Sequence, residues 1–194
     1  MSKTFAVQHV VDLAAFRNNV GCAHRGFDAA DGFDGFGRTY PVEELARVAP
    51  PAGGWPGGWG RGAPDNVACD GQKVALGRLL AVRTLTLLGA SCGGHLDDEI
   101  LLEGDGPADT AAAPFGLPDF LARAGAAGEE CEVATSVLRE HGRDIQGYGP
   151  RMWRVEVHFD SPVLCSALRL PLNPGVHLFG ARITVADGAV PERA

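Results

Sequence analysis

The clearest pattern along the chain is an alternation of apolar and polar residues near its C-terminal end. Between residues 151 and 159, every second residue is apolar: Trp153, Val155, Val157 and Phe159. The intervening positions carry Met152, Arg154, Glu156 and His158. A period of two places one set on each face of a β-strand, so we expect a half-buried strand with Trp153 in the core.

Similar but shorter patterns predict further strands. Two follow at residues 163–170 and 176–185, separated by the segment Pro171–Gly175, whose proline and glycine favour a tight turn. Upstream, strands are expected at residues 83–89 and 99–103, on either side of Gly93 and Gly94. The first strand is expected at residues 4–11. No internal repeat interrupts this series.

Helical periodicity is scarce. Residues 41–48 and 118–124 each begin with a proline and carry acidic residues in the first turn, which predicts two short helices inserted between strands. Many short strands without strand–helix alternation indicate an all-β fold, namely an antiparallel sandwich or a barrel. Residues 21–65 and 104–150 are expected to be loop-rich and to cover a face or carry a site.

Composition supports a folded, turn-rich chain. Its 194 residues suit a single domain over residues 1–194, with a core that needs no disulfide or structural metal. The 27 glycines and 13 prolines make up about a fifth of the chain, against an average of about 12%. Because 45% of the residues are hydrophobic, this excess indicates turns, not disorder.

Charge and cysteine usage exclude several classes of function. The formal net charge is −7 and there is no basic block, so nucleic acids and anionic membranes are not expected partners. The five cysteines are scattered and form no C-x-x-C pair, which favours reduced thiols over disulfides or a zinc ribbon. No signal peptide or membrane span is evident, and we therefore expect a cytoplasmic protein.

Several short blocks occur in an order that resembles a known type of domain. They are Phe16–Gly21, Asp34–Pro41, Pro64–Gln72, Leu87–Ala90 and Leu168–Pro171, and the most specific is the D-N-V-x-C-D-G-Q segment at residues 65–72. From about residue 16 to residue 185, the chain resembles the jelly-roll β-sandwich modules that serve as accessory domains of actinobacterial glycoside hydrolases. The resemblance implies a fold like that of carbohydrate-binding modules, without specifying a ligand.

The resemblance makes binding of a small, carbohydrate-like ligand the leading functional hypothesis. An alternative is a cofactor-independent enzyme, such as a cyclase, isomerase or dehydratase, of an actinobacterial natural-product pathway. A third is a structural module that meets another protein, and a homo-oligomer is compatible with all three. Covalent hydrolysis, nucleotide-driven chemistry and redox chemistry have no sequence support, because no nucleophile elbow, phosphate-binding loop, dinucleotide fingerprint or H-E-x-x-H helix is present.

Aromatic and amide side chains provide the candidate ligand contacts. Trp55 and Trp59 lie in a glycine-rich loop, where they could stack on a sugar ring or instead plug the end of the sandwich. Tyr40 and Arg38, from the Asp34–Pro41 block, could orient a ligand. Asp65, Asn66 and Gln72, which crowd a short segment with Asp70, could recognise hydroxyl groups or bind calcium, although loop capping is the favoured interpretation. No other cofactor is expected.

Acid–base chemistry would depend on a small number of residues. His24 lies in the first long loop among several aspartates, and we name His24 and Asp70 as the catalytic candidates of the enzyme hypothesis. His95, Asp97 and Asp98 have spacing that suits a metal or an acid–base pair, but polar turn residues are the favoured interpretation. The charged run at residues 139–144 is expected to be a solvated loop or helix end.

Overall fold

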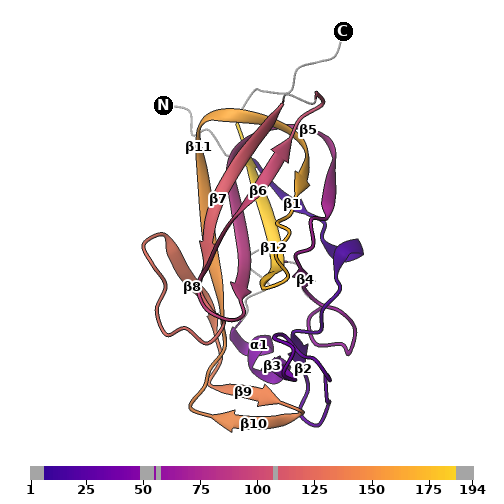
Figure 1. The fold of residues 1–194 in the computed structure, drawn as a ribbon, viewed down its shortest axis with the longest axis vertical. Coiled ribbons are helices and arrows are strands. Elements are labelled where there is room, and N and C mark those ends of the chain that lie inside the picture. The colour runs from indigo at the N-terminus through magenta and orange to yellow at the C-terminus, as the bar shows by residue number, and fades with distance from the viewer. Residues whose placement is uncertain (1–6, 49–54, 56–57, 107–108, 187–194) are drawn as a thin grey trace.

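The computed structural model describes residues 7–48, 55, 58–106 and 109–186, and β-strands are its main regular elements (Figure 1). The elements in chain order are β1 (Val7–Val11), a 3-10 turn (Ala14–Phe16), β2 (Cys22–Ala23), β3 (Arg38–Pro41), α1 (Val42–Val48), β4 (Val67–Ala68), β5 (Lys73–Ser91), β6 (Leu96–Glu103), β7 (Thr110–Leu117), β8 (Glu129–Ala134), β9 (Val137–Glu140), β10 (Arg143–Gln146), β11 (Arg151–Arg169) and β12 (Val176–Val185). None of the helices among these residues is long and apolar enough to cross a membrane.

Two long, bent strands generate the sandwich. The C-terminal half of β5 pairs with β12 and with the N-terminal half of β11, whereas the N-terminal half of β5 pairs with the C-terminal half of β11. The first layer is therefore β1, β12, β5 and β11, and the second is β5, β11, β6 and β7. With β5 and β11 each counted once per layer, this is the strand order of a jelly roll, as the sequence predicted.

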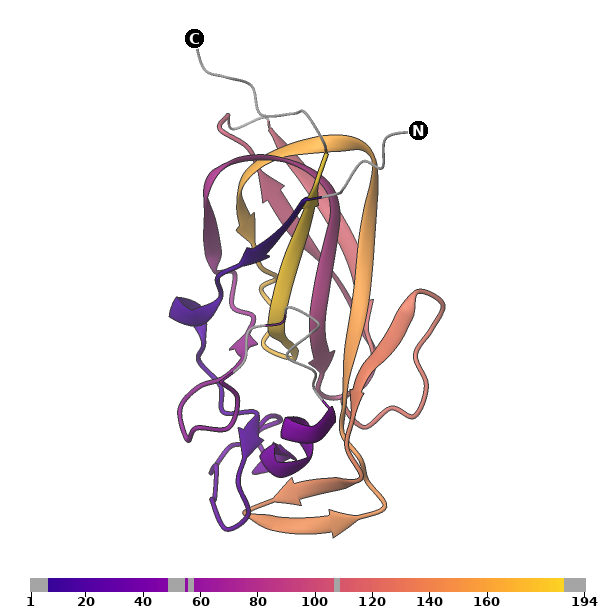
Figure 2. The same cartoon turned by 180° about the vertical axis from the view of Figure 1, so that it is seen from behind.

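The bends occur where the strand pairing is interrupted. In β11 the register shifts between His158 and Val163, and a second shift between Cys165 and Ala167 lies opposite Gly77 of β5. Gly77 has a φ of +73°, a conformation that residues with a side chain rarely adopt. Figure 2 shows both strands arching over at the end of the sandwich that is remote from α1.

The core lies between the two layers. Trp153 is 2% exposed, which confirms its predicted burial, and Leu85, Leu102 and Ile183 are fully buried. The layers approach closely at Gly89, where a methyl group would lie 3.1 Å from the Leu117 side chain of β7 in the opposite layer. It would also lie 2.5 Å from the carbonyl oxygen of His177 in the neighbouring strand β12.

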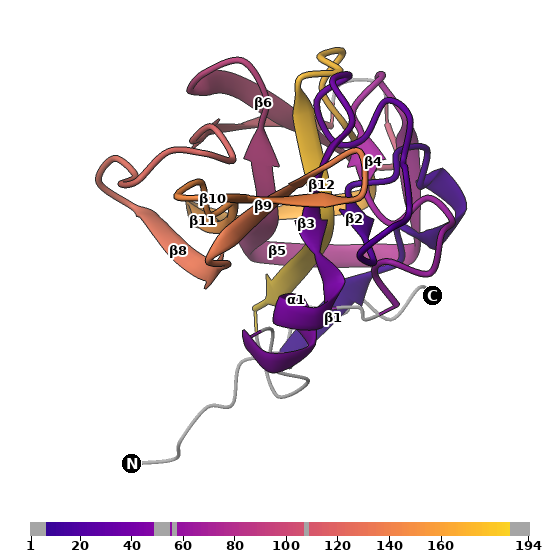
Figure 3. The same cartoon turned by 90° about the horizontal axis from the view of Figure 1, so that it is seen from below.

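A small second sheet covers one end of the sandwich. Its order is β10, β9, β3 and β2, and only the β2–β3 pair is parallel. In a jelly roll, the connections that lead into β5, β6, β11 and β12 all lie at the same end of the sandwich. The two long insertions, one before β5 and one before β11, are therefore brought together at that end. Figure 3 shows this small sheet and α1 lying across the end of the long strands. We call the small sheet, α1 and the loop between β2 and β3 the cap.

Several predicted elements agree with the structure. The turn at Pro171–Gly175, the strand at residues 176–185 and the helix after Pro41 are confirmed, and the strands expected at 83–89 and 99–103 lie within β5 and β6. The strand expected at 163–170 is not separate, because it continues from residues 151–159 as β11. Strand β1 covers residues 7–11, and residues 4–6 of the predicted strand lie outside the described part of the chain.

The helix predicted at residues 118–124 is wrong. These residues form no helix, because Phe120 inserts into the core and its backbone pairs with Ser91 and Arg151, while the Asp119 carboxylate accepts a bond from the amide of Leu121. Residues 104–150, which were expected to be loop-rich, contain four strands, β7, β8, β9 and β10, joined by irregular segments. Residues 21–65 do retain long irregular stretches around β2, β3 and α1.

Candidate functional site

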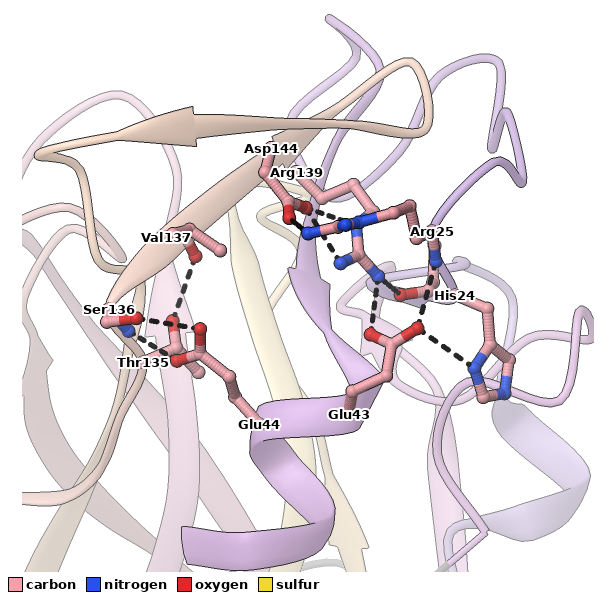
Figure 4. A network of polar contacts seen from close by, with 10 residues as sticks. His24, Arg25, Glu43, Glu44, Thr135, Ser136, Val137, Arg139 and Asp144 are labelled. Carbon is pink, nitrogen blue, oxygen red and sulfur yellow. Dashed lines mark hydrogen bonds and ion pairs between the residues drawn. The ribbon is translucent and has the colours of Figure 1, made fainter.

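The cap contains a shallow hollow of about 370 Å³ between α1 and the β9–β10 hairpin (Figure 4). Three segments form its walls: the loop after β2, the end of β3 with α1, and the β9–β10 hairpin. The lining residues are Arg25, Pro41, Glu43, Glu44, Arg47, Val137, Arg139 and Asp144.

Arg139 is the centre of this site. Its residue is only 2% exposed, and its guanidinium group donates hydrogen bonds in three directions. Nη1 reaches the carbonyl oxygen of Ala23 at 2.6 Å and Oε2 of Glu43 at 2.7 Å. Nε and Nη2 both donate to Oδ1 of Asp144, at 3.0 and 2.8 Å. A buried cation held by two carboxylates fixes β9, β10 and α1 relative to one another.

Arg139 lowers the pKa of both carboxylates that it contacts, Glu43 and Asp144. Burial alone would raise the pKa of Glu43, but hydrogen bonds from Arg139 and from the Arg25 amide outweigh it and lower the pKa to about 2. The pKa of Asp144 is also lowered, chiefly by its hydrogen bonds with Arg139, and Arg25 adds an ion pair to the same carboxylate. Both groups are therefore anionic across the neutral range.

The rim supplies further polar groups. Glu44 accepts hydrogen bonds from the amide and the hydroxyl of Ser136, the latter at 2.7 Å. Arg47 lies in the last turn of α1, is exposed, and makes no hydrogen bond or ion pair with any residue in the described part of the chain. Three arginines therefore face three carboxylates, and the hollow carries no formal net charge.

The structure places the two catalytic candidates in different surroundings. His24 lies next to the hollow, with Nδ1 3.4 Å from Oε1 of Glu43, and its side chain is 60% exposed. Asp70 is exposed in the turn before β5, where its amide donates to Oε1 of Gln72 at 2.7 Å. No contact joins these two residues, and the carboxylate beside His24 belongs to Glu43.

The two candidate tryptophans lie outside the hollow. Trp55 is partly buried; the guanidinium carbon of Arg182 lies 3.6 Å from its ring centroid, and its Nε1 donates to Glu132 at 3.3 Å. Trp59 packs edge-on against Phe179 at a centroid distance of 5.7 Å. The contact of Trp59 corresponds to the plug at the end of the sandwich that the sequence offered as an alternative to ligand binding.

Tyr40 and Arg38 are both engaged by the protein. Tyr40 is fully buried, and its hydroxyl donates to the carbonyl oxygen of Arg151 at 2.7 Å. Arg38 lies 3.4 Å from both Asp34 and Glu140, and its guanidinium group covers the ring of Phe36. Their role as ligand contacts stays a prediction, and neither residue is needed to form the hollow beside Arg139.

Asp65, Asn66 and Gln72 brace the loop that precedes β5. Asp65 accepts bonds from the amides of Gly21, Cys22 and Gly60 at 2.9–3.1 Å, while burial raises its pKa. The Gln72 side chain accepts a hydrogen bond from the amide of Asp70 and donates one to the carbonyl oxygen of Ala68. These contacts match the capping role that the sequence favoured over calcium.

The described residues were also considered as metal ligands. No group of three or more His, Cys, Asp or Glu side chains in the described ranges is arranged to hold a metal ion. His95 and Asp97 form a surface pair at 3.2 Å, with Glu129 3.5 Å from the same nitrogen of His95.

The residues that build the hollow were largely missed by the sequence analysis. Glu43 and Glu44 were assigned only to a helix start, and the run at 139–144 was expected to be solvated. Instead it forms the β9–β10 hairpin, with Arg139 buried inside. One signal was available, since His141–Gly142 resembles a two-residue hairpin turn, and both residues have positive φ.

Comparison of the chain with protein-family models and with curated proteins found no match.

Proposed function

We propose that the hollow in the cap binds a small, uncharged, hydroxyl-rich ligand of the carbohydrate type. The observation that carries this proposal is the balanced set of three arginines and three carboxylates around one hollow. A net charge would favour an ionic ligand, whereas a hydroxyl group can donate to a carboxylate and accept from a guanidinium group in the same site.

Two further features support this proposal. Arg139, Glu43 and Asp144 hold one another in place, so the polar groups are already oriented before a ligand arrives. Arg47 has no partner in the described part of the chain and can therefore donate to a ligand without breaking a bond to any of these residues. A volume of about 370 Å³ lies at the lower end of the range for small-molecule sites, about 300–1,000 Å³.

A glycan array followed by calorimetry tests the proposal. We expect the protein to retain neutral glycans and Arg47→Ala to weaken binding about tenfold, because a hydrogen bond to a charged group contributes roughly 1.5–3 kcal/mol. Arg78→Ala is the matched control, since Arg78 is an exposed arginine at the bend of β5. No retained glycan, or equal affinities of Arg47→Ala and the wild type, would overturn it.

The second candidate function is a cofactor-independent isomerase, cyclase or dehydratase, and it is favoured by the contact between His24 and Glu43. A histidine held by a carboxylate can shuttle a proton at neutral pH. Incubating the protein with each retained glycan and following the mixture by NMR tests this function. The enzyme function would be supported if the wild type converts a glycan and His24→Gln does not. If no glycan is converted, ligand binding remains the proposed function.

A further inference from the structure

Three side chains from distant segments meet beneath the cap. Cys92 lies in the turn between β5 and β6, His177 in β12, and Asn66 immediately before β4. The Sγ atom of Cys92 is 3.9 Å from Nε2 of His177, and Nδ1 of His177 is 2.8 Å from Oδ1 of Asn66. A thiol next to a histidine that is oriented by a third polar group is the arrangement used in nucleophilic catalysis.

The contacts of Asn66 determine which nitrogen of His177 carries the proton. Nδ2 of Asn66 lies within 3.2 Å of three oxygens, two from Asn19 and one from Asp65, so the amide nitrogen must face them. Oδ1 therefore faces His177 and accepts a hydrogen bond from Nδ1–H. Consequently Nε2 carries the lone pair, and it is the nitrogen that faces the Cys92 thiol.

His177 is held as a neutral base. It is 3% exposed, and its ring lies against Phe33 with centroids 4.2 Å apart. Burial lowers the pKa of His177 to about 4, although the Pro174 carbonyl acts in the opposite direction. At neutral pH the imidazole is uncharged and can accept a proton.

The Cys92 thiol is partly accessible and protonated. Burial raises its pKa, and the Asp34 and Asp119 carboxylates that face it raise the pKa further. A free thiolate is therefore scarce at neutral pH, and a base must remove the proton as the sulfur attacks. The position of Nε2 of His177 fits that role.

The turn that carries Cys92 is open at its two glycines. Gly93 and Gly94 have φ angles of +92° and +122°, and a methyl group at either position would contact nothing within 4 Å. Their amides both donate to Oδ2 of Asp119, at 3.1 and 2.8 Å. These bonds hold the turn, and with it Cys92, in a fixed position.

We propose that Cys92, His177 and Asn66 form a nucleophilic thiol site that hydrolyses small carboxylic esters. The thiol sulfur attacks the ester carbonyl carbon while Nε2 of His177 takes the thiol proton. The carbon–oxygen bond to the leaving group breaks, His177 returns the proton to the departing alcohol, and an acyl-Cys92 thioester remains. Water then attacks the thioester, gives a proton to His177 and releases the acid, and the sulfur regains the proton.

The first test uses p-nitrophenyl acetate and peptide mass spectrometry. We expect acetylation of Cys92, release of p-nitrophenol, and loss of both in Cys92→Ala. Cys131→Ala is the matched control, because Cys131 is an exposed thiol without a histidine partner, and its removal should leave the Cys92 reaction unchanged. Acetylation confined to Cys131 or to lysines, with Cys92 unmodified, would overturn the proposal.

The second test asks whether His177 acts as the base. We expect His177→Gln to slow acetylation of Cys92 about 10²-fold, the lower end of the usual contribution of general base catalysis, with folding checked by circular dichroism. The pH dependence of Cys92 acetylation in the wild type is an independent test. Attack assisted by neutral His177 should proceed at a nearly constant rate between pH 5.5 and 8, roughly the range above the histidine pKa and below that of the thiol. A rate that rises tenfold per pH unit, as for a free thiolate, would overturn the proposal.

Discussion

At the scale of single residues, the two proposed sites depend on buried groups with opposite electrostatic properties. Arg139 is a buried cation compensated by Glu43 and Asp144, whereas His177 is a buried base with no carboxylate bonded to it. The first arrangement favours the charged form of each partner, and the second favours the neutral form. Each should therefore give a different pH dependence of stability.

For His177, we expect the free energy of unfolding to fall as the pH is lowered from about 6.5 to about 4. In this window the unfolded chain binds a proton at His177 and the folded protein does not, so acid favours unfolding. The full effect corresponds to about 3 kcal/mol. Urea unfolding at several pH values should show this slope in the wild type and in His158→Gln, whose ring is exposed, but not in His177→Gln. A slope that persists in His177→Gln would contradict the assignment.

For Glu43, the expected window lies at lower pH. Its folded pKa is depressed, so its contribution to stability is complete above about pH 4.5 and is lost as the pH falls towards 2. Glu43→Gln should be less stable than the wild type at pH 6 and should lose less stability between pH 4.5 and 2. Glu99→Gln, an exposed glutamate on β6 without a described side-chain partner, is the control. Parallel melting-temperature profiles for Glu43→Gln and the wild type would count against the ion pair.

Sequence patterns predict which residues are buried better than they predict which side chains, distant in sequence, contact one another. The alternation around Trp153 is sufficient to place it in the core, because a period of two defines the faces of a strand. Nothing in the order of residues indicates that Glu43 and Arg139 will meet, since their contact depends on how the α1 and β9 segments dock. The same holds for Cys92, Asn66 and His177, which come from three separate segments.

At the scale of elements, the β9–β10 hairpin depends on its turn. Gly142 has a φ of +76°, and a methyl group there would lie 3.0 Å from the backbone carbon of Gly26. We expect Gly142→Ala to be destabilising through both backbone strain, roughly 1–2 kcal/mol, and loss of the contact with the Gly26 loop. Because this hairpin carries Arg139 and Asp144, glycan binding should weaken as well.

Gly147→Ala separates these two causes. Gly147 also has a positive φ, +82°, but a methyl group there would contact nothing within 4 Å. Denaturant unfolding should therefore show a smaller loss for Gly147→Ala than for Gly142→Ala. Equal losses would mean that strain alone accounts for both, and that the hairpin does not depend on the Gly26 loop.

The errors in predicting elements have physical causes. Strand β7 was missed because its alternating positions are mostly alanine, a weak strand former, although Ala113, Phe115 and Leu117 do face the core. Its Pro114 is tolerated because β7 is at the edge of the sheet. The segment at 118–124 carries helix-start signals, but burial of Phe120 and the tertiary bonds of Asp119 prevail over that local preference.

At the scale of the whole molecule, the cap and the sandwich share one aromatic cluster. Phe33 and Tyr40 come from the cap, and they contact Phe179 of β12 and Phe120, with ring centroids between 4.9 and 6.3 Å apart. Such a cluster couples the cap and the sandwich in folding. The resemblance to jelly-roll modules implies a jelly-roll sandwich, but not a cap with its own small sheet.

Phe33→Ala tests this coupling. Phe33 is 1% exposed, and removing its ring should cost about 3–5 kcal/mol and leave a cavity between cap and sandwich. In the wild type, we expect the amides of β3 and β9 to exchange with deuterium as slowly as those of β5, because the parts unfold together. In Phe33→Ala the cap amides should exchange faster while β5 remains protected. Phe36→Ala is the control, since Phe36 is a cap phenylalanine that is 67% exposed. If cap and β5 amides exchange at equal rates in Phe33→Ala, the coupling does not depend on the aromatic cluster.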